Sequence, residues 1–270
     1  MNKNQVTLKK FGEVGSIQGR FIRFGTPFTY CLYFVDGLLI DTGPPRHRKE
    51  ITRLTDSLDI KMIGLTHFHE DHSGNAAWLS RRYQVPVYMG RKTAQILQHP
   101  PLIPFYRRYV WGQMESVQGE VLPNELVTSN HRFLVIPSPG HAKDHCCFVE
   151  MERGWLFAGD LFLGKRLYYG LRDESVPDMI QSIDSVLCHS SVQTLFCGHA
   201  GIVEEGREAL SAKKAYLEQL VKRTKELAGA GVGEREIAKE LLPRHPLLEW
   251  ISGGEMAPVH LIRSILKENR

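Results

Sequence analysis

The stretch from Thr66 to His72, THFHEDH, holds three histidines and one aspartate. The apolar run KMIGL before it predicts a short buried strand, and NAAWLSRRY after it predicts a helix. His67 and His69 are two positions apart, so on an extended chain both side chains point to the same face. Asp71 and His72 follow where the chain turns. We therefore expect two imidazoles to bind one metal ion, and a carboxylate and a third imidazole to bind a second ion beside it.

Three further candidate ligands follow apolar runs later in the chain. His141 comes after FLVIPSPG, Asp160 after WLFAG and His199 after TLFCG. In each case a proline or glycine shapes the turn between the predicted strand and the candidate ligand. Loops held by rigid strands are the places where metal ligands are expected. We therefore predict that these three side chains complete the metal site that the first run begins.

Together with Asp41 in LLIDTG, these residues resemble the metallo-β-lactamase superfamily of metal-dependent hydrolases in their order and spacing. The resemblance spans about residues 20 to 205. It implies an α/β fold, a four-layer αββα sandwich of two similar βα halves, with the site along one edge of the sheets. Flavodiiron oxidoreductases, a redox branch with similar ligands, usually carry glutamate where this chain has His69. That difference favours hydrolysis.

The resemblance also implies how the ligands divide between two metal ions. The first ion would have three imidazole ligands: His67, His69 and His141. The second would have one carboxylate and two imidazole ligands: Asp71, His72 and His199. Asp160 would bridge both ions, opposite a bridging water or hydroxide. We predict that Asp71 and Asp160 are catalytic as well as metal-binding.

The chemistry of the ligands agrees with this division. Three neutral imidazoles leave an open position for water, as catalytic zinc requires. A divalent cation lowers the pKa of bound water from about 15.7 toward 7, which gives a hydroxide nucleophile at neutral pH. Zinc is the expected metal, and iron and manganese are alternatives.

Four more residues near these motifs need an interpretation. The resemblance assigns Asp41 to orienting metal ligands through hydrogen bonds, whereas turn propensity alone would make it a turn-capping aspartate. Glu70 points away from the face of His69 and stays unassigned. His145 resembles a histidine of glyoxalase II that does not bind metal. We therefore interpret Asp144 and His145 as supporting residues and not as ligands.

Two segments could form the walls of a substrate pocket. Residues 98–113 combine prolines with the aromatic and basic side chains Tyr106, Arg107, Arg108, Tyr109 and Trp111. They predict either a lid over the metals, a plain surface helix, or a stacking surface for single-stranded RNA. The segment from Lys165 to Arg172 follows Asp160 and is also basic and aromatic. Both segments favour a small anionic substrate.

The composition indicates a cellular compartment for the protein but does not identify a partner. The chain has 270 residues, a formal charge of +4 and five cysteines with no CxxC spacing. Such cysteines are expected to be buried and reduced, which points to the cytoplasm. The N-terminal residues have no apolar stretch typical of a secretion signal, and no run of about 18 apolar residues predicts a membrane span. We expect a cytoplasmic protein.

The predicted organisation is a catalytic domain over residues 1–205 and a helical subdomain over residues 206–270, with three helices. The predicted function is hydrolysis of a small ester, thioester or lactone. The alternative is a single-strand-specific endoribonuclease or phosphodiesterase. Nucleic acid is the less favoured partner, because the second C-terminal helix, GEREIAKELL, carries as much acid as base. The oligomeric state stays open.

Overall fold

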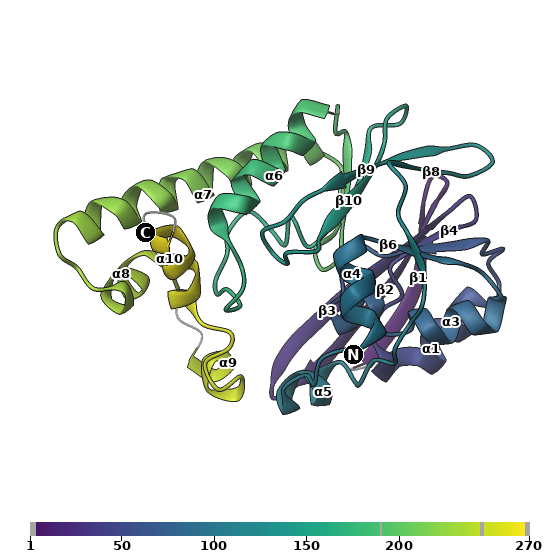
Figure 1. Ribbon diagram of the computed structural model, residues 1–270, viewed down its shortest axis with the longest axis horizontal. Helices are drawn as coiled ribbons and strands as arrows, with labels where there is room; N and C mark the ends of the chain where they lie inside the picture. The colour runs from purple at the N-terminus through teal and green to yellow at the C-terminus, as the bar shows by residue number, and fades with distance from the viewer. Residues whose placement is uncertain (1–3, 190, 244–245, 268–270) are drawn as a thin grey trace.

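Two β-sheets pack face to face, and helices cover the outer face of each sheet (Figure 1). The computed structural model describes residues 4–189, 191–243 and 246–267. The expected α/β sandwich with a C-terminal helical part is therefore confirmed.

The first sheet has seven strands that follow one another in sequence order. Its strands are β1 (Asn4–Phe11), β2 (Val14–Arg23), β3 (Thr26–Val35), β4 (Leu38–Ile40), β5 (Met62–Gly64), β6 (Val87–Met89) and β7 (Glu120–Val121). The first four strands pair antiparallel, and the pairs from β4 to β7 are parallel. Asp36 and Gly37 join β3 to β4, and both have positive φ, 45° and 85°. This is the conformation that a two-residue hairpin with a type I′ turn requires.

The second sheet has six strands in the order β13-β12-β11-β10-β9-β8. Its strands are β8 (Glu125–Val127), β9 (Arg132–Pro137), β10 (Cys146–Glu150), β11 (Trp155–Gly159), β12 (Thr194–Cys197) and β13 (Gly201–Val203). Only β11 and β12 pair in parallel. Every residue of β10, β11 and β12 is buried, because the other sheet covers one face and helices cover the opposite face.

Aromatic side chains fill the space between the two sheets. Tyr33 of the first sheet packs edge-on against Phe157 and Phe196 of the second sheet. The rings of Phe157 and Phe196 stack with their centroids 4.6 Å apart. Each such fully buried side chain contributes about 1.5–3 kcal/mol through removal of its apolar surface from water. This packing holds the two halves of the sandwich, and with them the ends of their strands, in a fixed relation.

The outer layers are helical. Helices α1 (Arg48–Thr55), α3 (Ala76–Tyr83) and α4 (Arg91–Gln98) cover the first sheet, and α6 (Val176–His189) and α7 (Gly206–Gly229) cover the second. Their buried faces share hydrophobic clusters with the strands beneath them, as Ile51 and Leu79 do with Ile63, and Ile183 and Leu210 with Leu195.

The C-terminal part contains one more helix than the sequence predicts. After α7 come α8 (Glu234–Leu241), α9 (Pro246–Ile251) and α10 (Pro258–Lys267). The short helix α9 escaped prediction because its six residues bury no side chain fully, which leaves no apolar face to recognise. Its Leu247 and Trp250 are strongly exposed. Among the helices in the described residues, none is long and apolar enough to cross a membrane.

Candidate metal centre

Five strands end at one edge of the sandwich, and each is followed within four residues by a predicted site residue. Asp41 follows β4, His67 follows β5, His141 follows β9, Asp160 follows β11 and His199 follows β12. Within the first sheet β4 and β5 run parallel, and within the second β9, β11 and β12 run in the same direction. Their carboxyl ends therefore meet, so that loops from both halves of the chain supply one site.

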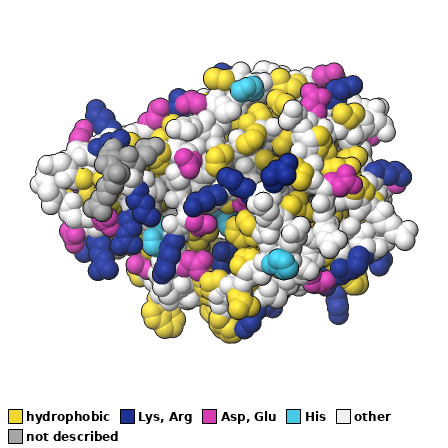
Figure 2. Space-filling view, in the orientation of Figure 1, with side chains coloured by type: hydrophobic (Ala, Val, Ile, Leu, Met, Phe, Trp, Pro, Cys, Tyr) yellow, Lys and Arg dark blue, Asp and Glu magenta, His cyan; other side chains and the backbone are white. Residues whose placement is uncertain are grey.

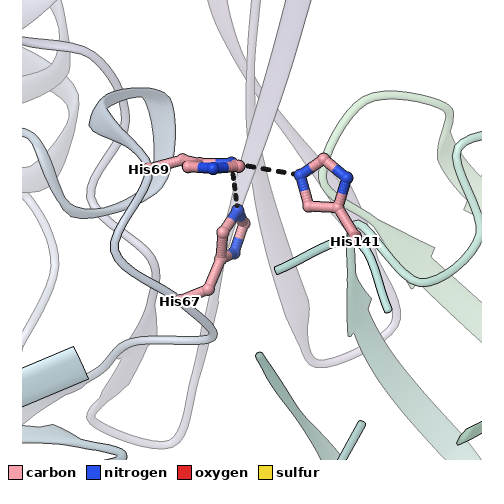
Figure 3. A group of neighbouring side chains, drawn as sticks. All are labelled: His67, His69 and His141. Carbon is pink, nitrogen blue, oxygen red and sulfur yellow. Dashed lines mark hydrogen bonds between the residues drawn. The ribbon is translucent and has the colours of Figure 1, made fainter. Parts of the chain in front are cut away.

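The nitrogens of three histidines converge on one point (Figure 3). Nδ1 of His69 lies 3.0 Å from Nε2 of His67 and 3.1 Å from Nε2 of His141. An imidazole nitrogen carries either one hydrogen or one lone pair, so Nδ1 of His69 cannot form two full-strength hydrogen bonds at once. Ligands about 2.0–2.1 Å from a tetrahedral zinc ion lie roughly 3.3–3.4 Å from one another. The donor atoms present fit such an ion.

A second group lies beside the first. Donor atoms of Asp71, His72 and His199 come within 4.8 Å of one another. Nε2 of His72 is buried, and no hydrogen-bond partner for it lies among the described residues. The same holds for Oδ1 of Asp160, 3.3 Å away. Buried polar atoms normally have a partner. The two facing atoms therefore fit a cation that both would bind.

Asp160 lies between the two groups. Its Oδ2 is 3.3 Å from Nε2 of His141 and 3.2 Å from Nε2 of His199, and its Oδ1 faces His72. A single carboxylate thus contacts histidines of both predicted ligand sets. The structure brings together all seven predicted ligands: His67, His69, Asp71, His72, His141, Asp160 and His199.

Asp41 contacts His72 of the second group directly and His67 of the first group through Thr66. Its Oδ2 lies 2.7 Å from Nδ1 of His72 and accepts a hydrogen bond from Oγ1 of Thr66 at 2.9 Å. The same hydroxyl lies 3.0 Å from Nδ1 of His67. Asp41 has a φ of 60°, a left-handed conformation that aspartate tolerates better than most residues. With Nδ1 as the donor to Asp41, Nε2 of His72 presents its lone pair to the centre.

Two contacts that were not predicted from the sequence have a similar role at His141 and His199. Oε1 of Glu174 lies 2.9 Å from Nδ1 of His141, and the backbone oxygen of Thr29 accepts a hydrogen bond from Nδ1 of His199. A partner at one ring nitrogen fixes the tautomer and leaves the other nitrogen for a metal. Glu174 follows no recognisable motif, and Thr29 acts through its backbone, so no sequence signal marks either.

The electrostatics differ between the two groups. Burial lowers the pKa of His67 and His69 well below 6.5, with neighbouring imidazoles and Arg107 adding to the effect. Burial also opposes a charge on His72 and His199, but Asp160, together with Asp41 at His72 and Asp71 at His199, outweighs it and raises the pKa of both well above 6.5. Neutral imidazoles are the form that a metal requires. His67 and His69 already have it, whereas His72 and His199 would release protons on binding an ion, as would His141, whose pKa Asp160 and Glu174 raise against the effect of burial.

His145 uses both of its ring nitrogens inside the protein. Nε2 accepts a hydrogen bond from the backbone N–H of Asp160 at 3.0 Å, and Nδ1 lies 2.8 Å from Oγ of Ser138. This leaves no nitrogen for a metal. The contact requires glycine before Asp160, because a Cβ at Gly159 would lie 2.6 Å from Nε2 of His145. Gly198 has a similar role, since a Cβ there would lie 2.5 Å from Cε1 of His72.

Asp144 supports the ligand run Thr66 to His72 through a hydrogen bond. Its Oδ2 accepts hydrogen bonds from the backbone N–H of Phe68 and from Oγ1 of Thr93, both at 2.9 Å. It therefore fixes the loop that carries His67 and His69.

Glu70, left unassigned from the sequence, forms a buried ion pair. Its carboxylate accepts two hydrogen bonds from Arg107 in α5 (Phe105–Val110), at 2.6 and 2.7 Å. Arg107 also lies 3.5 Å from Glu255 in the C-terminal part. The segment of residues 98–113, here called the insertion, is thereby tied to the ligand run on one side and to the C-terminal part on the other.

A cavity of about 260 Å³, here called the metal cavity, opens beside the cluster. His69, Asp71, His141, Asp160 and His199 line its floor. Its walls are mostly apolar or aromatic: Pro27, Phe28, Tyr106, Val110, Trp111, Leu163, Leu167, Tyr168, Tyr169, Leu171 and Met256.

The insertion and the segment after Asp160 contribute only part of what we expected. Tyr106, Arg107 and Trp111 line the metal cavity, whereas Arg108 and Tyr109 do not. Arg166 also lines it, but the prediction was wrong for Arg172, which lines a different cavity. Gly170, two residues before Arg172, forms a backbone bridge with Ala257 in the C-terminal part.

Comparison with curated proteins finds relatives over parts of the chain. Thioesterase pkgB of Emericella nidulans is 32% identical over 132 residues, 47% of this chain and 33% of that protein. An atrochrysone carboxyl ACP thioesterase of Aspergillus fumigatus is 30% identical over 172 residues, 62% of this chain and 48% of that protein. The matches thus span a third to a half of these fungal relatives. An uncharacterized protein of Aquifex aeolicus is 27% identical over 184 residues, 64% of this chain and 82% of that protein.

Solved structures share the fold. A metallo-β-lactamase from Pontibacter korlensis superposes with a TM-score of 0.64 at 18% identity, over 79% of this chain and 99% of that one. A metallo-β-lactamase family protein from Thermus thermophilus gives the same TM-score and identity over 100% of this chain and 94% of that one. The sequence model of the metallo-β-lactamase superfamily matches residues 33–223, well over half of the chain. The protein therefore belongs to the metallo-β-lactamase superfamily.

Proposed function

We propose that the protein is a metal-dependent thioesterase whose substrates carry an apolar acyl group. The observation that carries this proposal is the metal cavity, in which aromatic and aliphatic walls stand over a floor of histidines and carboxylates. An apolar cavity with few polar groups is suited to an acyl chain whose reactive carbonyl must reach the polar floor. The relatives that are named thioesterases support the same reaction class.

The proposed centre holds two divalent ions, with zinc as the expected metal. One ion would be held by the imidazoles of three histidines: His67, His69 and His141. The other would be held by one carboxylate and two imidazoles: Asp71, His72 and His199. Asp160 would be shared, in keeping with its contacts to both groups. When bound, the ions activate a water molecule at neutral pH and polarise the substrate carbonyl.

The two carboxylates on the floor are available as proton acceptors. Burial by itself would raise the pKa of Asp71 and Asp160, but neighbouring imidazoles, His199 foremost, hold the pKa of each below its usual value. Both are therefore ionised at neutral pH. Because Asp71 has fewer imidazole contacts than Asp160, we assign to it the acceptance of a proton from the attacking water.

The walls of the metal cavity place the substrate and exclude water. Phe28 and Trp111 pack edge to face with ring centroids 5.5 Å apart, which gives the acyl group a rigid apolar wall. Tyr169 also lines the cavity, and burial raises its pKa to about 12, so its hydroxyl stays protonated at physiological pH. That hydroxyl can donate a hydrogen bond to the carbonyl oxygen, where negative charge develops during attack.

The test is a substrate panel with metal-replete protein. It contains thioesters of increasing acyl length, matched oxygen esters, lactones, a phosphodiester and single-stranded RNA. We expect thioester cleavage with kcat/KM that rises with acyl length, and loss of activity in Asp160→Ala. The matched control Asp59→Ala, at an exposed aspartate, should retain it. Cleavage of RNA with a steep salt dependence, and of no thioester, would show that the alternative, a phosphodiesterase, is correct.

A further inference from the structure

A second cavity, of about 1040 Å³, lies between residues 172–175 and the C-terminal helices. Six cationic side chains line it: Lys143, Arg172, Arg235, Lys239, Arg263 and Lys267. We call it the basic cavity. Figure 2 shows Lys and Arg side chains gathered on this face over α8 and α10.

Like charges in the basic cavity are placed where they repel one another. Arg235 and Lys239 are four positions apart in α8, and Arg263 and Lys267 are four positions apart in α10. Side chains at this spacing lie on the same face of a helix, where two like charges repel one another. Both pairs line one cavity, because α8 and α10 pack against each other. The two pairs therefore concentrate positive charge in this cavity, where it attracts anions.

Three carboxylates also line the basic cavity, those of Asp173, Glu174 and Glu249, and they compensate only part of the charge of the six cations. Arg263 pairs with Glu234 at 2.7 Å, and Lys239 lies 3.5 Å from Glu236. Over the described part of the chain, no carboxylate comes within 4.0 Å of the other four cations, which are Lys143, Arg172, Arg235 and Lys267. These four are also largely exposed to solvent, so their side chains can rearrange around an incoming ligand.

The basic cavity adjoins the metal cavity. Glu174 lines both, and its carboxylate contacts His141. Met256 lines the metal cavity, whereas the next two residues line the basic cavity. Gly170 and Ala257 exchange backbone hydrogen bonds of 3.2 Å, which join the two segments into one wall. The two cavities therefore share a wall, with the histidines on one side and the cations on the other.

We propose that the basic cavity binds the phosphate of the thiol that carries the acyl group, the phosphopantetheine chemistry shared by coenzyme A and carrier-protein prosthetic groups. This inference rests on the proposed thioesterase function. This phosphate is anionic at pH 7 in every form, with about −1.5 to −2 charges as the monoester of free phosphopantetheine and about one as the diester of a carrier protein, and an arginine guanidinium can bind two of its oxygens at once. The acyl group enters the apolar metal cavity, the thioester carbonyl lies at its floor, and the thiol part extends to the cations.

The kinetic test compares acyl-pantetheine with acyl-phosphopantetheine, which differ by the phosphate alone. We expect about a tenfold lower KM for the phosphorylated substrate, with similar kcat, because the phosphate is bound equally in ground and transition states. In the double variant Arg235→Gln/Lys239→Gln the KM ratio should fall toward one. The matched control Lys9→Gln/Lys10→Gln removes two exposed charges from β1 and should keep the wild-type ratio.

A second readout needs no turnover. Calorimetric titration should show that coenzyme A binds to the wild type and to the control variant, that binding weakens with added salt or inorganic phosphate, and that it weakens about tenfold in the double variant. Unphosphorylated pantetheine should bind equally to all three proteins. A thermal melt shows whether the double variant is folded, and the single variant Lys239→Gln replaces it if it is not.

The outcomes separate this inference from the function on which it rests. Equal KM values with and without phosphate, together with thioester cleavage, would overturn the phosphate site and leave the thioesterase intact. No cleavage of any thioester would overturn the proposed function, while the titration still reports on the site. Tighter binding of single-stranded RNA than of coenzyme A, lost in the double variant, would assign the basic cavity to nucleic acid. A lower KM for the carrier-bound or the free coenzyme A thioester identifies the source of the phosphate.

Discussion

Nδ1 of His72 lies 2.7 Å from Oδ2 of Asp41, and Oγ1 of Thr66 connects the same carboxylate to Nδ1 of His67. One aspartate thus orients a histidine of each predicted metal site. It does so from the end of β4, the strand next to β5, so the parallel pairing of two strands sets the geometry of the centre. The contact also accounts for the left-handed backbone conformation of Asp41. This conformation turns the carboxylate back toward the next loop.

Asp41→Ala is expected to weaken metal binding by about 10- to 100-fold, the usual effect of removing a hydrogen-bond partner from a ligating histidine. Competition with a chromophoric chelator measures the affinity. Asp59→Ala, which removes an exposed carboxylate, serves as the control and should leave the affinity unchanged. An unchanged affinity in Asp41→Ala would remove Asp41 from the account of the centre.

Glu174→Gln tests the corresponding contact at His141, whose Nδ1 lies 2.9 Å from the carboxylate. The amide keeps the size of the side chain but removes its charge, so we expect a smaller loss of metal affinity than in Asp41→Ala, about tenfold. The exposed Glu204 gives a matched control as Glu204→Gln. If both variants bind metal as the wild type does, the Glu174 contact has no part in orienting His141.

The pair Glu70 and Arg107 is expected to behave as a buried ion pair. Arg107→Met leaves the fully buried carboxylate of Glu70 without its partner, and should lower the free energy of unfolding by about 3–5 kcal/mol. The double variant Glu70→Gln/Arg107→Met should lose much less. Urea unfolding of the two single variants and the double variant gives the coupling energy. Additive losses would mean that the two side chains do not stabilise one another.

Lys213 predicts a pH dependence of stability. It is fully buried in α7, its Nζ donates a hydrogen bond to the backbone oxygen of Phe162, and burial lowers its pKa to about 8. Its unfolded pKa is about 10.4, so between pH 8 and 10.4 the unfolded state binds more protons and stability rises with pH. The full effect is about 3 kcal/mol, present above pH 10.4 and lost as the pH falls to 8.

Urea unfolding at several pH values between 8 and 10 measures this effect as the difference between the wild type and Lys213→Met. The difference should grow with pH in favour of the wild type. Lys222→Met, at an exposed lysine of the same helix, controls for the loss of a lysine and should follow the wild-type profile. Parallel profiles for the wild type and Lys213→Met would contradict the assignment of a lowered pKa.

The resemblance carried by the ligand motifs implied the sandwich, and local patterns predicted the gathering of the candidate ligands. Buried runs mark the strands, and a histidine or aspartate just past each run comes to the shared edge once the strands align. Glu70 and Arg107 are 37 positions apart, and only the packing of α5 against the ligand run brings them together. Glu174 reaches His141 through a segment with no regular pattern. Tertiary contacts of this kind leave no periodic or spaced signal in a single sequence.

The same limit applies to the walls of the two cavities. Arg166 and Arg172 stand in one basic segment, and nothing in their spacing tells that they line different cavities. Gly170 stands between them in the chain, and its bridge with Ala257 depends on the position of the C-terminal part. The division into residues 1–205 and 206–270 stays a prediction. Buried leucines of α7 share one hydrophobic cluster with β11 and β12, so the core continues across the predicted boundary.

The most direct test of the central claim, a binuclear metal-dependent thioesterase, is a titration of chelator-treated protein with Zn²⁺ while thioester cleavage is followed. The metal-free protein should be inactive, and activity should rise to a plateau at two equivalents of zinc per chain. In Asp160→Ala, which removes the carboxylate that contacts both histidine groups, no plateau should be reached. Thioester cleavage by the metal-free protein, or a plateau at one equivalent, would contradict the account.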